Sequence, residues 1–451
     1  MIIELQNFGP IKSFKFDTSK DMHAIFGKNN IGKSYAISAV YLILKGLREY
    51  DIDFRKSLLS ADIIEPFKNK LIEKLNKEKS NEYVFNEEVI LFLKESFKNS
   101  MLKDIGNSFK NTFDIKNINN AKSSERLRIV IQFYSDSISI VFDESNQELI
   151  IDNFQLNGHY KICISDTEKN PTISYGEKIY YKSRTSDSII GIGRIAYNYH
   201  SFLKFIANLH SIFYLPASRS GLYNALNSFG AIFAELSRNR NFIRNKIEIP
   251  NIAEPISDYF LNLNTIDKAQ ANEHYLTHFE EIEQEILKGK ITLDNETKKY
   301  YYVPTDTDMR LELSFTSSMI SEIAPIIAHL KYIIPLESDK PSILFIEEPE
   351  AHLHPEIQVL LIEYFVKLSK GNVKIVMTSH SNYIFNKLSN LLIANKIDKE
   401  KLSVSLMKMT PEGSVIEDGA MKIDEYGIED NNFVDVAEQL YEERMSLLEK
   451  L

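Results

Sequence analysis

The segment best suited to chemistry is Gly27-Lys28-Asn29-Asn30-Ile31-Gly32-Lys33-Ser34. Its spacing, G-x-x-x-x-G-K-S, lets successive backbone N–H groups converge on phosphate oxygens. The Lys33 amine is placed to reach the outer phosphates of a nucleotide, and the Ser34 hydroxyl is placed to bind Mg²⁺. An apolar run precedes the segment and a helical pattern follows it, which makes a chance glycine turn the weaker alternative. The sequence therefore predicts that residues 27–34 bind ATP with Mg²⁺.

Two carboxylates follow the apolar run at 342–346, whose composition is typical of a strand buried in a parallel sheet. They are Glu347 and Glu348, and ligands of open α/β sheets bind at the carboxyl ends of strands. Glu347 is suited to holding Mg²⁺, and Glu348 is suited to polarising the water that attacks the γ-phosphate. A solvated acidic turn is the alternative interpretation.

A histidine, His380, follows the next apolar run, residues 373–377. A histidine at this place can donate a hydrogen bond to the γ-phosphate and respond to its presence. A purely structural histidine is the alternative. The three motifs together predict Lys33, Glu348 and His380 as catalytic residues.

Periodicity indicates the elements that must position these residues. The start of the chain predicts two short strands, a third strand at 23–26, the glycine loop and a helix over 35–44. Residues 127–164 alternate with a period of two, which predicts antiparallel strands. A helix over 355–368 lies between the two apolar strands near the carboxyl end, and this alternation is typical of a doubly wound parallel sheet.

Changes of composition predict four segments. Further elements expected in them are a strand at 311–314 and a helix over 318–332, kinked at Pro325. The segments are an amino-terminal ATPase lobe (1–46 and 128–190), a helical insertion (47–127), a helical subdomain (191–310) and a carboxy-terminal ATPase lobe (311–451).

Composition limits the compartment and the partners. The chain has 451 residues, of which 43% are hydrophobic, and carries a net charge of -10. That charge argues against a protein that coats nucleic acid, although a local basic groove is compatible with it. The single cysteine, Cys163, excludes a disulfide framework within the chain. Without a signal peptide or a run of about 18 apolar residues, we expect a cytoplasmic protein with no membrane partner.

The three motifs together resemble those of the ABC-type ATPases of the OLD/RecF/SMC-like group. The resemblance rests on residues 27–34, 346–355 and 378–381, and residues 5–11 are similar to that group's first strand. It implies an α/β ABC-ATPase head, with a mixed amino-terminal β lobe, a doubly wound parallel sheet and helical insertions. The segment Tyr214-Leu215-Pro216-Ala217-Ser218-Arg219 resembles one common in stand-alone ATPases of bacterial anti-phage systems.

The resemblance also implies a homodimer, or a larger homo-oligomer, in which ATP is sandwiched between two heads. The candidate signature segment is 313–319, where Ser317 or Ser318 would donate to the partner's γ-phosphate. An ordinary serine helix cap is the alternative, because the usual glycine is missing. Glu347 stands where the group usually has aspartate. The group's D-loop corresponds to 350–355, and its His352 and His354 are alternatively a metal pair.

The function expected from these motifs is that of a sensor ATPase in an anti-phage defence system. No Asp-x-Asp pair follows His380, so a Toprim nuclease is not expected and the partner would be a separately encoded effector, either a nuclease or a toxin. The main alternative is a RecF/SMC-like DNA repair or maintenance ATPase with DNA as partner. A transporter subunit is disfavoured, and a non-hydrolysing nucleotide switch stays open.

Arg219 and the segment 433–451 each allow two interpretations. Arg219 is a candidate for contact with phosphate or DNA, or equally for a structural ion pair. Residues 433–451 have the pattern of an amphipathic helix, and we expect it to pack on the ATPase lobe rather than to serve as a detachable partner-binding helix.

Overall fold

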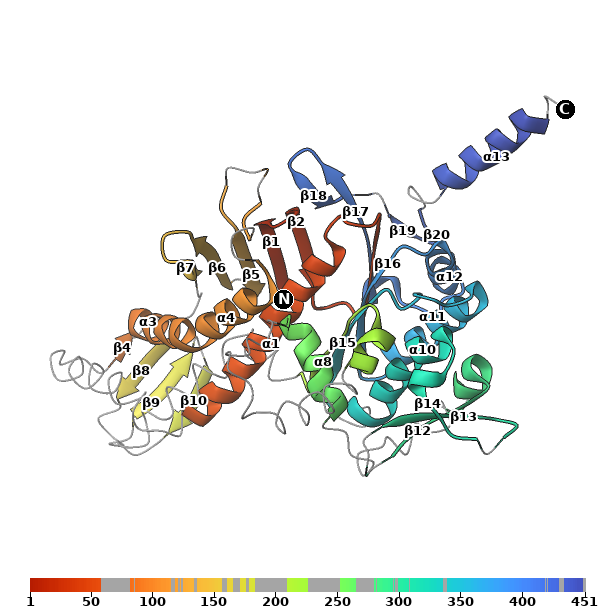
Figure 1. Cartoon of the computed structure of the whole chain (residues 1–451). Helices are drawn as coiled ribbons and strands as arrows, with labels where there is room; N and C mark the ends of the chain where they lie inside the picture. The colour runs from red at the N-terminus through yellow and green to blue at the C-terminus, as the bar shows by residue number, and fades with distance from the viewer. Residues whose placement is uncertain are drawn as a thin grey trace, which may run out of the picture. The chain divides into compact units, whose positions relative to one another are not determined.

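The computed structural model divides the chain into two compact units, which are considered separately (Figure 1). The first unit comprises Met1–Thr18, Leu42–Lys110 and Asp114–Leu209; the second comprises Ser19–Tyr41, Asn111–Phe113 and His210–Leu451. Within the described part of the chain, no helix is both long and apolar enough to cross a membrane. The described residues are 1–57, 82–84, 86–114, 118–120, 122, 125–133, 136–155, 160–164, 171–175, 178–182, 209–225, 252–264, 280, 282–294, 296, 299–307, 309–335, 339–417, 419, 421–429 and 434–448.

The second unit is built on a parallel sheet. Its strands lie in the order β11-β15-β16-β3-β17, and an antiparallel strand, β18, follows β17. Their bounds are β3 (Met22–Gly27), β11 (Ile212–Leu215), β15 (Ser342–Glu347), β16 (Val373–Ser379), β17 (Leu402–Thr410) and β18 (Gly413–Ile416). This order brings the strand before the glycine loop next to β16, which ends just before His380, and leaves β15 one strand further on.

Helices cover both faces of this sheet, as side-chain alternation along β15 shows. Leu344 and Ile346 belong to one apolar core together with residues of α10 (Ser318–Ala328), α11 (Pro355–Ser369) and α12 (Asn382–Ile393). Phe345 points the other way and packs edge-on against Tyr41 of α1 (Lys33–Ser57), with ring centroids 5.7 Å apart. Figure 1 shows α10, α11 and α12 together beside β15 and β16. The predicted doubly wound α/β class is confirmed.

The smaller elements of the second unit refine two predicted boundaries. The strand expected at 311–314 ends at Glu312, because Leu313–Phe315 form a 3-10 turn. The helix expected over 318–332 is α10, followed by a π-helix over His329–Ile333, with Pro325 inside α10. The remaining elements are α8 (Glu254–Asn264), the π-helix Glu283–Leu287, β12 (Gly289–Leu293), β13 (Tyr300–Pro304), β14 (Leu311–Glu312), the 3-10 turn Lys399–Lys401, β19 (Ile423–Asp424), β20 (Gly427–Ile428) and α13 (Val434–Leu448).

The first unit contains two antiparallel sheets, as the period-two pattern of 127–164 predicts. The sheets have the orders β2-β1-β5-β6-β7 and β10-β9-β8-β4. The strands are β1 (Ile2–Phe8), β2 (Ile11–Asp17), β4 (Glu82–Val84), β5 (Arg128–Phe133), β6 (Asp136–Asp143), β7 (Glu148–Gln155), β8 (Tyr160–Ile164), β9 (Pro171–Tyr175) and β10 (Lys178–Lys182).

Helices α3 (Asn86–Phe97) and α4 (Lys103–Thr112), with the π-helix Lys98–Leu102 between them, occupy the segment predicted as a helical insertion. Strand β4 lies in the same segment, so it is not helical throughout. Much of the helical subdomain expected at 191–310 lies outside the described residues. The four predicted segment boundaries stay predictions.

The carboxy-terminal helix α13 leaves its apolar side chains in solvent. Leu440 is 61% exposed and Leu447 is 56% exposed, and Tyr441 and Met445 are exposed as well. The prediction that this helix packs on the ATPase lobe is therefore wrong for residues 440–448. Leu440 and Tyr441 are adjacent, so they point about 100° apart on a helix with 3.6 residues per turn. At 100° per residue, Leu440, Tyr441, Met445, Leu447 and Leu448 fall within an arc of about 160°, so they form one broad apolar face that is exposed here.

Candidate active site

The loop at 27–34 has a backbone that only particular residues tolerate. Gly27 has φ 145° and Gly32 has φ 91°, and Asn30 also lies in the left-handed region at 61°. A Cβ on Gly27 would come within 2.4 Å of Ile31 Cδ1 and 2.6 Å of the Met407 carbonyl oxygen. The glycine pattern is thus required by conformation and by space. Lys28, Asn29 and Asn30 are exposed at the tip of the loop.

The Lys33 side chain lies inside this loop. Its amine donates to the main-chain oxygens of Gly27 and Lys28, both at 2.9 Å, and the residue is only 5% exposed. Burial lowers the pKa of Lys33, against the opposing effect of the carboxylates of Glu348 and Glu350. The loop therefore holds a buried cation at the start of α1, where the helix dipole also favours an anion.

The two predicted metal ligands contact each other. The Ser34 hydroxyl donates to Glu347 Oε2 at 2.8 Å, and the Tyr214 hydroxyl donates to Glu347 Oε1. Tyr214 also shares a hydrogen bond of 2.8 Å with Ser38 of α1. Burial raises the pKa of Glu347, while the hydrogen bonds from Tyr214 and Ser34 lower it. Tyr214 therefore fixes one oxygen of the carboxylate and Ser34 contacts the other.

This pair of oxygen donors fits Mg²⁺, which is commonly held by one or two protein oxygens together with water and phosphate oxygens. Across the described ranges, no group of three or more His, Cys, Asp and Glu side chains is placed to hold a metal ion. The alternative metal pair at His352 and His354 thus gains no third ligand in the part of the chain that the structure describes.

Glu348 and His380 lie together at the carboxyl ends of β15 and β16. His380 Nδ1 is 3.8 Å from Glu348 Oε1, and the two side chains are 45% and 32% exposed. The Glu348 backbone has φ 40°, a left-handed conformation that is uncommon outside glycine, and its N–H donates to the Thr378 oxygen at 3.1 Å. Such strained backbone is often found at functional sites, where neighbouring contacts hold it.

Glu350 accepts hydrogen bonds from Ser379 and His380, a role that the sequence does not reveal. It is 4% exposed, and its Oε1 accepts from the Ser379 hydroxyl at 2.7 Å and from the His380 N–H at 2.9 Å. The same oxygen is 3.5 Å from His380 Nδ1. The only local signal is its place in the Glu-Pro-Glu run, and the run does not say which carboxylate is buried.

Arg219 is completely buried, so it is in no position to contact DNA or a bound phosphate. Its Nε lies 3.5 Å from Glu322 Oε2 on α10, and both side chains are at most 2% exposed. Of the two alternatives for Arg219, the structure therefore shows the ion pair. Glu322 lies beyond the first turn of α10, one turn after Ser318.

The candidate signature serines are exposed at the amino end of α10. Ser317 is the N-cap, and its hydroxyl accepts from the Ile320 N–H at 3.4 Å. Ser318 begins the helix, and the neighbouring Phe315 is 79% exposed. Among the described residues, no hydrogen bond joins either serine to residues 27–34. The structure thus brings together the loop, Glu347, Glu348 and His380, and leaves the serines facing solvent.

Comparison with known proteins gives one family. A family model described as "AAA ATPase domain" matches residues 1–385, well over half of the chain. No curated protein matches the chain significantly. Two similar structures are the SMC head domain from Thermotoga maritima (11% identity, 92% of this chain and 97% of that one, TM-score 0.34) and an Smc head domain with an extended coiled coil bound to the C-terminal domain of ScpA, derived from Pyrococcus furiosus (12%, 98% and 98%, 0.34). TM-scores of this size do not establish a shared fold, so the fold is defined by the topology of this chain.

Proposed function

This chain belongs to the AAA ATPase domain family, and we propose on that premise that it binds ATP with Mg²⁺ and hydrolyses it. The observation that carries the proposal is the hydrogen bond between Ser34 and Glu347, 2.8 Å long and spanning 313 residues of sequence. It joins the phosphate-binding loop to the carboxylates that end β15. A chance glycine turn or a solvated acidic turn would not produce that contact.

Each residue then has a chemical part. The loop N–H groups and Lys33 would bind the phosphates, and Ser34 and Glu347 would hold a Mg²⁺ ion, which when bound would supply positive charge to the phosphate oxygens. Glu348 would orient the attacking water and accept its proton, and His380, whose Nδ1 lies 3.8 Å from Glu348 Oε1, would donate to the γ-phosphate.

We infer that the complete site needs a second copy. Ser317 and Ser318 are exposed at the start of α10, where backbone N–H groups are free of intrahelical partners. A helix start is suited to binding the γ-phosphate of a nucleotide held by another subunit. The chain would then form a homodimer, or a larger oligomer, with ATP between the copies.

The proposal is tested by replacing Glu348 and Lys33. Glu348→Gln keeps the size of the side chain and removes the base, so turnover falls by about 100-fold or more while ATP still binds. Lys33→Ala, in contrast, should abolish ATP binding, because it removes the cation of the phosphate-binding loop. Steady-state phosphate release and equilibrium ATP binding measure the two effects. A wild type that binds ATP but has no turnover above that of Glu348→Gln and Lys33→Ala would leave only a nucleotide switch.

The biological role that we propose is that of a sensor ATPase in anti-phage defence, which controls a separately encoded nuclease or toxin. It is supported by the resemblance of residues 214–219 to a segment of such ATPases, and in this chain Tyr214 and Arg219 of that segment bind the carboxyl end of β15. Co-expression with the products of neighbouring genes tests it. Phage protection that requires Lys33 supports the role, whereas no protection and no copurifying effector contradict it.

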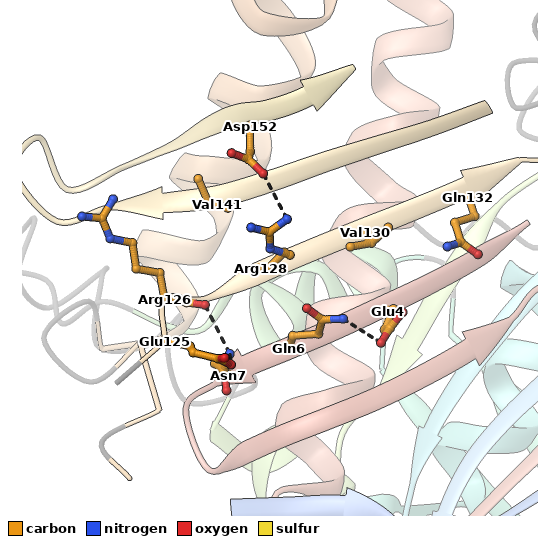
Figure 2. Close-up of a pocket in the computed structure, with 10 residues that line it drawn as sticks. All are labelled: Glu4, Gln6, Asn7, Glu125, Arg126, Arg128, Val130, Gln132, Val141 and Asp152. Carbon is orange, nitrogen blue, oxygen red and sulfur yellow. Dashed lines mark hydrogen bonds and ion pairs between the residues drawn. The ribbon is translucent and has the colours of Figure 1, made fainter. Parts of the chain in front are cut away.

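A DNA maintenance ATPase is less well supported by the described surface of the first unit. Figure 2 shows its concave polar face over β1, β5, β6 and β7, with a volume of about 700 Å³. Arg128 is paired with Asp152 at 3.0 Å, and the remaining charged lining residues are Arg126, Glu4 and Glu125, so the carboxylates outnumber the cations three to two. A groove for a phosphate backbone needs an excess of cations, which this face does not have.

A further inference from the structure

The second unit contains a fully buried ion pair that the hydrolysis steps above do not use. Arg219 is 0% exposed, Glu322 is 1% exposed, and Arg219 Nε lies 3.5 Å from Glu322 Oε2. Two charges taken out of water are costly unless many hydrogen bonds compensate them. The other hydrogen bonds of the Arg219 guanidinium must therefore offset the cost of burying this pair.

The Arg219 guanidinium binds the main chain at the ends of the catalytic strand. It donates to the carbonyl oxygen of Glu347 at 2.7 Å and to that of Glu348 at 3.3 Å. The Glu348 residue is the one with the left-handed backbone, φ 40°. Such a conformation persists only where its surroundings fix it, and Arg219 is one of the groups that fix it.

The same guanidinium is bound to α10. Its Nε donates to the Glu322 carbonyl oxygen at 3.2 Å as well as facing the Glu322 carboxylate. The other carboxylate oxygen accepts from the hydroxyl and the N–H of Ser220. Glu322 is only four residues from Ser318, so it sits one turn from the candidate signature serines. The planar fork of arginine is needed to contact both segments at once.

We propose that Arg219 and Glu322 are positioning residues that join the amino end of α10 to the backbone of Glu347 and Glu348. This inference rests on the proposed function, in which Ser317 and Ser318 contact the nucleotide of a second copy. Docking of that nucleotide at the start of α10 would then set the catalytic carboxylates of this copy. The ion pair is thus the physical link that couples the two ATP sites of a dimer.

The test is Glu322→Gln, which keeps the shape of the side chain and removes its charge. We expect ATP affinity and ATP-dependent dimerisation to stay within about twofold of the wild type, because residues 27–34 and the serines are unchanged. We expect kcat to fall roughly ten- to hundredfold, because a small displacement of catalytic groups has effects of that size. Arg219→Lys should show the same division between kcat and binding, since lysine keeps the charge but not the fork.

A second buried ion pair of the same unit supplies the matched control. Lys331 Nζ lies 2.9 Å from Glu283 Oε1, Glu283 is 0% exposed, and this oxygen also accepts from the Ile291 N–H at 2.7 Å. Glu283→Gln removes the charge from a comparable pair, in which Lys331 also donates to the Ile291 oxygen of β12 at 3.3 Å. It should lower the melting temperature as Glu322→Gln does, and leave kcat per bound ATP unchanged.

The kcat measurements separate a failure of the coupling from a failure of the proposed ATP hydrolysis. Equal kcat values for Glu322→Gln and Glu283→Gln, each normalised to bound ATP, would overturn the coupling while leaving ATP hydrolysis intact. A wild type that releases no phosphate would overturn the proposed function and this inference with it. If Glu322→Gln does not fold, Ser220→Ala replaces it, because it removes one orienting bond of Glu322. A normal kcat in that folded variant also overturns the proposal.

Discussion

At the scale of single residues, the site is defined by how each carboxylate is held. Glu347 accepts from Ser34 and Tyr214, Glu350 accepts from Ser379 and the His380 N–H, and Glu348 carries the unusual backbone. The Tyr214 bond accounts for the glutamate at 347. Because the longer side chain has one more rotatable bond than aspartate, a fixed donor restricts its oxygens to one geometry.

Tyr214→Phe removes that donor and keeps the ring. We expect the Mg²⁺ concentration that gives half-maximal turnover to rise roughly 10- to 100-fold, the usual cost of losing a group that orients a metal ligand. Titration of turnover with Mg²⁺ at saturating ATP measures it. Tyr302→Phe is the control, since Tyr302 lies in β13 and its hydroxyl donates to the Leu287 oxygen at 2.7 Å. An identical Mg²⁺ dependence in both variants would remove Tyr214 from the site.

At the scale of elements, the site depends on a loop that turns between β3 and α1. Gly27 is the critical residue because its φ is 145° and its Cα faces both Ile31 and the Met407 oxygen of β17. A glycine-bounded turn of this kind lets loop N–H groups converge on a phosphate.

Gly27→Ala should lose ATP binding and destabilise the fold by about 1–3 kcal/mol, the range for strained backbone. Gly106→Ala is the matched control, because Gly106 lies in α4 with no atom within 4 Å of an added Cβ. That change should be neutral or stabilise the helix by about 0.5–1 kcal/mol. Urea unfolding and ATP binding compare the two variants. Retained ATP binding in Gly27→Ala would contradict this view of the loop.

The predictable elements are those with local signals. The loop follows from its glycine spacing, and β15 and β16 follow from apolar runs that are followed by Glu347 and His380, so the parallel sheet and the position of the candidate site at its edge could be expected. The ion pair of Arg219 with Glu322 could not, because it spans 103 residues and depends on burial. The exposed face of α13 could not either, since the apolar pattern of a helix does not state whether a partner surface covers it.

At the scale of the whole molecule, the second unit keeps an uncharged histidine in its core. His329 is 0% exposed, stacks on the Tyr259 ring at 5.4 Å and has its Nδ1 2.8 Å from the Pro325 oxygen. Burial lowers its pKa to about 4. Below the ordinary histidine pKa of about 6.5, the unfolded chain binds a proton that the folded chain does not.

Stability should therefore fall as pH drops from about 6.5 towards 4, by an amount on the order of 3 kcal/mol for this group alone. Above about pH 6.5, His329 is neutral in the folded and in the unfolded chain, so it does not make the free energy of unfolding depend on pH. Unfolding by urea at several pH values, in the wild type and in His329→Gln, isolates the effect. The difference in unfolding free energy between the two proteins should shrink as the pH falls, and a constant difference would contradict a buried neutral histidine.

The most direct measurement of the central claim, an ATPase site completed by a second copy, mixes two inactive variants. Lys33→Ala disables the loop, and Ser318→Arg blocks the start of α10. In a two-fold dimer, one mixed pair has one intact site, so the equimolar mixture should regain turnover above that of either variant alone: roughly a quarter of the wild-type value for independent sites, and a smaller fraction where Arg219 and Glu322 couple the two sites. No regain, with mixed dimers demonstrated by mass, would contradict the composite site, as would wild-type turnover by Ser318→Arg alone.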